Sequence, residues 1–117
     1  MKIKIGELNG AALDWAVAKC EGLDIRRLSG GEFLLADGDF WFPSIDWAQG
    51  GPIIERERIR LEFDGSAFGI NAGKWESSSP ECGYVVSGET PLIVAMRCYV
   101  ASKLGDEVEV PEEVCIV

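Results

Sequence analysis

The pattern of apolar and polar residues predicts a helix near the start of the chain. Within residues 8–20, apolar side chains recur three and four positions apart, as they do on the buried face of an amphipathic helix. These side chains are Leu13, Ala16, Val17 and Cys20. Asn9 is a suitable N-cap for this helix, and Gly22 is a suitable end.

A second helix is predicted over residues 90–104. Thr90 is a favourable N-cap, Pro91 fits the first helical position, and Gly105 follows the last one. The first two turns are apolar almost all round, so we expect this helix to be buried on most sides. Arg97 is the main charged interruption.

The other segments show the shorter period of strands. Apolar and polar residues alternate, or short apolar runs lie between turn residues, in residues 1–5, 25–28, 33–36, 59–63, 68–71 with 74–76, and 84–86. The tail at 108–111 can pair at a sheet edge. Short turns between strands favour antiparallel pairing. We therefore predict one α+β domain over residues 1–117, an α/β sandwich in which a mostly antiparallel sheet packs with an N-terminal and a C-terminal helix.

Residues 43–56 depart from both patterns and have the composition of a binding surface. Ser44 is expected to cap a first short helical turn, Gly50 and Gly51 to end it, and Pro52 to begin a second turn. Two adjacent glycines let a backbone approach a ligand closely. The free N–H groups at the start of the second turn would attract an anion such as phosphate.

The side chains of this segment suit a nucleotide-like ligand. Trp47 offers a flat face for stacking, Asp46 and Gln49 can orient a planar group by hydrogen bonding, and Arg56 can pair with phosphate. The predicted ligand contacts here are Ser44, Asp46, Trp47, Gln49, Gly50, Gly51, Ile53, Ile54 and Arg56. Each feature also has a structural interpretation, because Gly-Gly-Pro commonly ends helices and Trp47 can fill a core.

Two further residues are candidates for the same site. Arg97 is a charge on an apolar helix and therefore needs a partner, either a ligand or one of the carboxylates of the chain. Trp75 lies between Lys74 and Glu76 in a turn-rich region and can form another wall of the pocket. A cross-strand aromatic contact is the structural alternative for Trp75.

The amino-acid composition limits the kinds of binding and catalysis that we expect from this protein. The net charge is −9, which disfavours non-specific binding to nucleic acid and leaves mimicry of DNA as a minor alternative. The chain has no histidine, and its four cysteines are not in metal-binding spacing. We predict no metal, no cofactor and no catalytic residue of the serine–histidine or cysteine–histidine type. An enzyme that cleaves a nucleotide with Asp46 or Glu55 is the remaining catalytic alternative.

The hydrophobic segments are short, and the first residues do not resemble a signal peptide. We therefore expect a cytoplasmic protein without a membrane partner.

Three blocks of sequence resemble the NinX family of small bacteriophage proteins. They are GAALDWAVA at residues 10–18, PSIDWAQGGPIIERE at residues 43–57, and TPLIVAMRCYVASKLGDEV at residues 90–108. The resemblance implies a phage accessory protein that is expressed in the bacterial cytoplasm, and it implies no particular activity. Residues 25–42 and 77–89 carry no such resemblance.

These observations lead to two main functional hypotheses. The first is a non-catalytic binder that sequesters a nucleotide-derived host immune signal, such as a cyclic nucleotide or a cyclic ADP-ribose derivative. Sequestration needs enclosure of the ligand, which a homodimer or higher homo-oligomer would help to provide. The second is a protein-interaction module that inhibits or recruits a host or phage protein through exposed aromatic residues.

Overall fold

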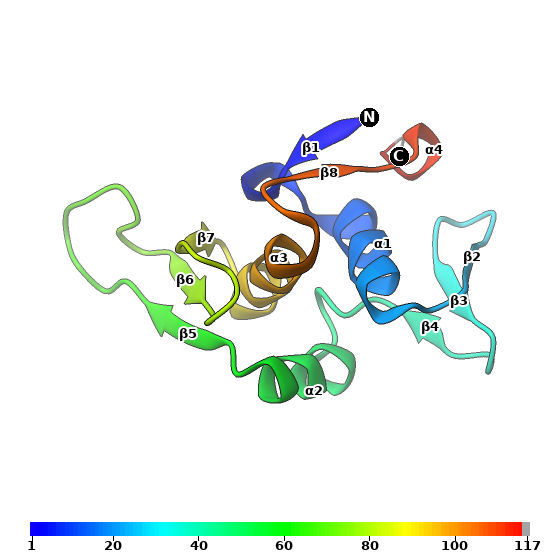
Figure 1. The fold of residues 1–117 in the computed structure, drawn as a ribbon, viewed down its shortest axis with the longest axis horizontal. Coiled ribbons are helices and arrows are strands. Elements are labelled where there is room, and N and C mark those ends of the chain that lie inside the picture. The colour runs from blue at the N-terminus through cyan, green and yellow to red at the C-terminus, as the bar shows by residue number, and fades with distance from the viewer. Residues whose placement is uncertain (116–117) are drawn as a thin grey trace.

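The computed structural model describes residues 1–115 and confirms the α+β class (Figure 1). Within this range the chain forms four α-helices, one short 3-10 helix and eight strands. The helices are α1 (Gly10–Glu21), α2 (Trp47–Glu57), α3 (Pro91–Leu104) and α4 (Glu112–Cys115), and the 3-10 helix is η1 (Ile5–Glu7). The strands are β1 (Lys2–Lys4), β2 (Ile25–Arg27), β3 (Phe33–Leu35), β4 (Phe40–Trp41), β5 (Arg60–Phe63), β6 (Trp75–Ser78), β7 (Val86–Gly88) and β8 (Glu107–Glu109).

The two long predicted helices are confirmed, including most of their end signals. In α3 the Thr90 hydroxyl accepts a hydrogen bond from the Ile93 N–H at 3.1 Å. Gly22 ends α1 in the left-handed conformation that glycine adopts without strain. Asn9 occupies the N-cap position of α1, but its side chain makes no capping hydrogen bond. Local sequence signals thus predict most of the ends of these two helices, and α1 begins two residues later than predicted.

The strands pair antiparallel, as predicted, but they form three small sheets instead of one. The sheet orders are β1-β8, β2-β3-β4 and β5-β6-β7. Figure 1 shows why one sheet does not form: β2–β4 lie beside α1, whereas β5–β7 lie on the opposite side of the molecule beside α3. The apolar surface of α3 contacts β5, β6, β7, α1 and α2, so it is covered by several short elements.

Several boundaries between the helices differ from the sequence prediction. The strand predicted to end at residue 76 continues through residues 77–78 as β6, whose Ser77 pairs with Val86. Phe40 and Trp41 form strand β4, and the short helix α4 was not predicted. These segments are too short for a clear period, so their partners decide their conformation.

The core lies between α1, α3 and the strands that flank them. Its fully buried large side chains come from α1, α3 and the segments next to them, and they include Leu8, Leu13, Val17, Met96 and Val100. Trp41 closes one side, where its indole N–H donates to the backbone oxygen of Asp14 at 2.9 Å. No helix among residues 1–115 has both the length and the apolar character that a membrane crossing needs.

Candidate functional site

The Gly-Gly-Pro segment is the largest local departure from the prediction. Residues 47–57 form one continuous helix, so Gly50 and Gly51 do not end a turn and Pro52 does not begin one. The N-cap is Asp46, whose carboxylate accepts the Ala48 N–H at 3.0 Å, and not Ser44. The N–H groups of Ile53 and Ile54 therefore lie inside a helix and not at its free start. The anion site expected from that helix start does not form.

Other predicted ligand contacts of this segment are engaged by the chain itself. The Gln49 side chain accepts the Phe42 N–H at 2.7 Å and donates to the Phe40 oxygen at 2.5 Å, which fastens α2 to β4. Ser44 is buried, and its N–H donates to the Asp14 carboxylate at 2.9 Å. These polar groups therefore position the loop before α2.

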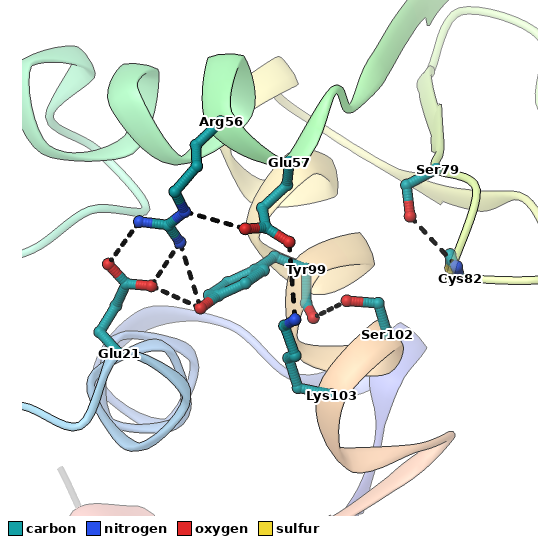
Figure 2. Close-up of polar contacts among 8 residues, drawn as sticks. All are labelled: Glu21, Arg56, Glu57, Ser79, Cys82, Tyr99, Ser102 and Lys103. Carbon is teal, nitrogen blue, oxygen red and sulfur yellow. Dashed lines mark hydrogen bonds and ion pairs between the residues drawn. The ribbon is translucent and has the colours of Figure 1, made fainter.

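Arg56 belongs to a polar network that joins α1, α2 and α3 (Figure 2). Its guanidinium donates to both carboxylate oxygens of Glu21, at 3.1 and 2.6 Å, and to Glu57 at 2.8 Å. It also lies against the Tyr99 ring, whose hydroxyl hydrogen-bonds Glu21 and accepts from Arg56. Lys103 pairs with Glu57 at 3.7 Å. In this arrangement Arg56 ties the helices together instead of facing a ligand.

The network also sets the ionisation of its members. Burial acts to raise the pKa of the Glu21 carboxyl, but the hydrogen bonds from Arg56 and Tyr99 outweigh burial and hold this pKa below its ordinary value. Burial and the neighbouring Glu21 raise the pKa of the Tyr99 hydroxyl. The network is therefore stable as an ionised carboxylate held by a neutral phenol and a guanidinium.

Removing the Tyr99 hydroxyl tests this network. Tyr99→Phe is expected to lower the free energy of unfolding by about 1 kcal/mol, because the hydrogen bond from the Tyr99 hydroxyl to the charged Glu21 is lost. The effect is modest because the Arg56 side chain in this network is about half exposed to solvent. Urea denaturation measures the change. In an Arg56→Gln background the loss should shrink, since the two groups share Glu21. Equal losses in both backgrounds would show that the hydroxyl acts independently of the network.

Arg97 occupies a different and more unusual environment. The residue is 7% exposed, and its Nε donates to the Leu8 oxygen at 2.7 Å while Nη1 donates to the Ser87 oxygen at 3.0 Å. Among residues 1–115, no carboxylate lies within ion-pair distance of it, so the expected salt bridge is absent. Burial lowers the pKa of the guanidinium, and Glu89 acts in the opposite direction. The structure thus holds a buried cation by backbone oxygens.

The fit of Arg97 depends on a glycine. A Cβ atom on Gly88 would lie 2.8 Å from Nη1 of Arg97 and 2.9 Å from a Val94 methyl group. The absence of a side chain at this position of β7 lets the guanidinium reach the strand backbone.

Arg97 also lines a cavity of about 620 Å³, a volume in the range of small-molecule sites. The cavity lies where η1, β7, α3 and the start of β8 meet. Its polar side chains are Lys4, Asn9, Lys74, Tyr84, Ser87, Glu89, Arg97, Asp106 and Glu107. The Asn9 amide makes no capping bond, and Tyr84 presents an exposed aromatic ring.

The predicted site residues are therefore divided between two regions. Arg97 lines this cavity, and Trp75 lies one residue after Lys74 and pairs with Gly88, another lining residue. Trp75 packs against Phe63 with ring centroids 5.4 Å apart, which is the cross-strand alternative. Residues 44–56 do not line the cavity, and Trp47 is 54% exposed at the start of α2.

The sequence interpretation missed most of the cavity. Lys4, Asn9, Lys74 and Glu107 come from four separate parts of the chain, and no spacing among them announces a site. The one usable signal was Arg97, because a charge within an apolar helix requires an explanation.

Burial makes two of the cysteine thiols poor nucleophiles. Burial raises the pKa of the Cys20 and Cys98 thiols to about 11, which disfavours the nucleophilic thiolate. Cys82 is buried beside Ser79, whose hydroxyl accepts its N–H at 3.1 Å (Figure 2). No group of three or more potential metal-ligating side chains gathers within the described part of the chain.

A family comparison accounts for the sequence blocks that run through these elements. The family model described as bacteriophage P22 NinX matches residues 4–103. The chain belongs to the NinX family. The NinX match spans most of the chain and includes α1, α2 and all of α3 except its last residue, together with Arg97. It supports a phage accessory protein, and no curated protein matches the chain.

Proposed function

We propose that this NinX protein binds a small nucleotide-derived anion, without catalysis, in the cavity that Arg97 lines. The observation that carries the proposal is the buried guanidinium without a carboxylate partner at the wall of a 620 Å³ cavity. Burying a charge is costly unless a partner compensates it. Backbone oxygens provide part of that compensation, and an anionic ligand would provide the rest.

The surroundings of Arg97 suit the other parts of such a ligand. Lys4 and Lys74 add positive charge to the lining, Asn9 offers amide donors and an acceptor, and Tyr84 offers a ring for stacking. In a phage accessory protein, sequestration of a host immune signal is a function that binding alone can perform. A cyclic nucleotide or a cyclic ADP-ribose derivative is the ligand class that we propose.

Thermal denaturation with a panel of cyclic mononucleotides, cyclic oligonucleotides and cyclic ADP-ribose isomers tests the proposal. We expect one class to raise the melting temperature in a dose-dependent way, because a ligand that binds only the native state stabilises it. Mass spectrometry of the compound afterwards should recover it unchanged. Turnover of the compound would instead revive the enzymatic alternative.

The chain offers a matched pair of lysine variants. Lys4 lines the cavity, whereas Lys2 stands two residues away on the same strand and outside the lining. Lys4→Ala is expected to weaken ligand binding about threefold and Lys2→Ala to leave it unchanged, since an exposed ion contact contributes at most about 1 kcal/mol. Arg97→Lys keeps the positive charge but loses the paired N–H donors of the guanidinium, so it should weaken binding more than Lys4→Ala does. Equal affinities in all these variants would place the ligand elsewhere.

The exposed apolar residues favour a protein-interaction module as the second candidate. Phe68 and Ile70 are 90% and 95% exposed in the loop between β5 and β6, and Ile45 and Trp47 are exposed before and at the start of α2. Large exposed aromatic and aliphatic side chains are typical anchors of interfaces. If this candidate is correct, cross-linking and pull-down from infected cells should recover a stoichiometric protein partner with the unmodified chain. The Trp47→Ala and Phe68→Ala variants should recover less of it.

A further inference from the structure

The cavity that Arg97 lines carries acidic as well as basic groups. Lys4, Lys74 and Arg97 are balanced by Glu89, Asp106 and Glu107, so the charged lining residues sum to zero. Arg97 is the buried member of this set, whereas Lys4 and all three carboxylates are exposed and Lys74 is half-buried. The site therefore has a buried cation beneath a charged rim in which three carboxylates, here called the acidic rim, outnumber two lysines.

The topology keeps these opposite charges in one place. Glu107 of β8 lies directly opposite Lys4 of β1 in the antiparallel register, and the Ile5 N–H donates to the backbone oxygen of Asp106 at 3.0 Å. Glu89 immediately follows β7, whose Ser87 backbone oxygen holds Arg97. Glu89 thus follows the strand that holds the guanidinium, and Asp106 and Glu107 lie at the start of β8, beside Lys4 and Ile5.

Such a rim limits what the cavity can bind. Ionised carboxylates only accept hydrogen bonds, so they attract hydroxyl and amino groups and repel a second negative charge nearby. A terminal phosphate carries more than one negative charge near neutral pH, as a phosphorylated side chain does. A phosphodiester carries one. A carboxylate beside a nucleotide commonly accepts a hydrogen bond from a ribose hydroxyl.

We infer that Glu89, Asp106 and Glu107 make the site selective for ribonucleotide phosphodiesters over terminal phosphates and over 2′-deoxy analogues. The diester group pairs with the Arg97 guanidinium, and the ribose hydroxyls donate to the acidic rim. This inference rests on the proposed function and specifies the ligand class of the same site.

Calorimetric titration with matched commercial probes tests the inference on the full chain. The probes are 3′,5′-cyclic AMP, cyclic di-AMP, their 2′-deoxy analogues, and 5′-AMP and ATP. At least one ribonucleotide diester is expected to bind at least about tenfold more tightly than its 2′-deoxy analogue and than ATP. The deoxy analogue lacks the 2′-hydroxyl, so its binding would leave carboxylates of the rim without a hydrogen-bond donor.

Substitutions of the rim should remove this selectivity without abolishing binding. In Glu89→Gln, Asp106→Asn and Glu107→Gln, the deoxy-to-ribo ratio of the dissociation constants should fall toward one and ATP should bind more tightly. Glu109→Gln is the control, because Glu109 lies on the same strand as Glu107 but does not line the cavity. Circular dichroism and melting temperatures of each variant separate a loss of selectivity from a loss of folding.

The outcomes distinguish this inference from the proposed function. Tighter binding of ATP or 5′-AMP than of the diesters, or equal binding of ribo and deoxy probes, would overturn the inference and leave a nucleotide site in place. Binding of none of these probes, in a protein that also shows no thermal shift with the cyclic ADP-ribose isomers, would overturn both.

Discussion

The protein is expected to lose about 2.5 kcal/mol of stability between pH 4 and pH 7 through ionisation of Asp14, and replacing Asp14 by asparagine should abolish this loss. Asp14 is 6% exposed in α1, and its pKa is raised from 3.8 to about 6. Burial is the main cause of this shift, and the hydrogen bonds from the Ser44 backbone and side chain oppose it. The magnitude follows from about 1.4 kcal/mol per pKa unit.

The sign follows from proton linkage. Below pH 3.8 the carboxyl is protonated in both the folded and the unfolded protein, so its full stabilising contribution is present. Between pH 3.8 and about 6 the unfolded chain has lost this proton and the folded chain has kept it, so the free energy of unfolding falls as pH rises. Above about pH 6 the contribution stays constant at its lower value.

Urea denaturation of both proteins at pH 4, 5, 6 and 7 measures this effect. The difference in unfolding free energy, asparagine variant minus the protein with Asp14, should increase by about 2.5 kcal/mol over that range. Asp24→Asn is the control, because it removes one charge at an exposed position of the same chain. Parallel pH profiles for the Asp14 variant and the unmodified protein would show that the carboxylate ionises in the folded state without a penalty.

The second large effect is expected at Gly50, where alanine should lower the free energy of unfolding by about 1–3 kcal/mol. Gly50 is buried in α2, and a Cβ atom there would lie 2.7 Å from the Pro43 backbone oxygen and 2.7 Å from a Leu92 methyl group. Both distances are below those that real Cβ atoms show, and the backbone oxygen cannot move aside easily. The substitution must therefore separate α2 from α3 or from the preceding loop.

The adjacent glycine provides a matched control. A Cβ atom on Gly51 would meet nothing within 4 Å, and this residue also lies within α2. Gly51→Ala should therefore stabilise the protein by about 0.5–1 kcal/mol, because alanine restricts the unfolded chain and favours the helix. Thermal and urea denaturation of the two variants should give changes of opposite sign. Changes of the same sign would show that the α2–α3 contact is not as close as described.

The Gly-Gly pair illustrates how one local signal can have two meanings. Two glycines followed by proline favour the end of one helical turn and the start of another, and the sequence was interpreted in that way. In the structure Gly50 packs closely against Leu92 and Pro43. The Asp46 cap and the buried Ile53 keep α2 helical across the Gly-Gly-Pro segment. Tertiary contact between α2 and α3 thus overrides the local preference.

Trp47 and Arg97 show the same limit for the functional site. Sequence analysis placed both in one pocket, because each looked unexplained in its own segment. The structure buries Arg97 in α3 and leaves Trp47 exposed at the start of α2. Whether a polar or aromatic residue faces a ligand depends on the neighbours that the fold supplies, and those neighbours are far away in the chain.

The sequence by itself determined the features that depend on residues close together in the chain. Helical spacing and the Thr90 and Gly22 end signals placed α1 and α3, short turns between strands indicated antiparallel pairing, and three sequence blocks indicated the NinX family. Only the tertiary structure decided the division into three sheets, the continuity of α2 and the cavity around Arg97. The physical reason is that these features depend on contacts such as Arg97 with Leu8 and Lys4 with Glu107, which join residues about ninety to a hundred positions apart.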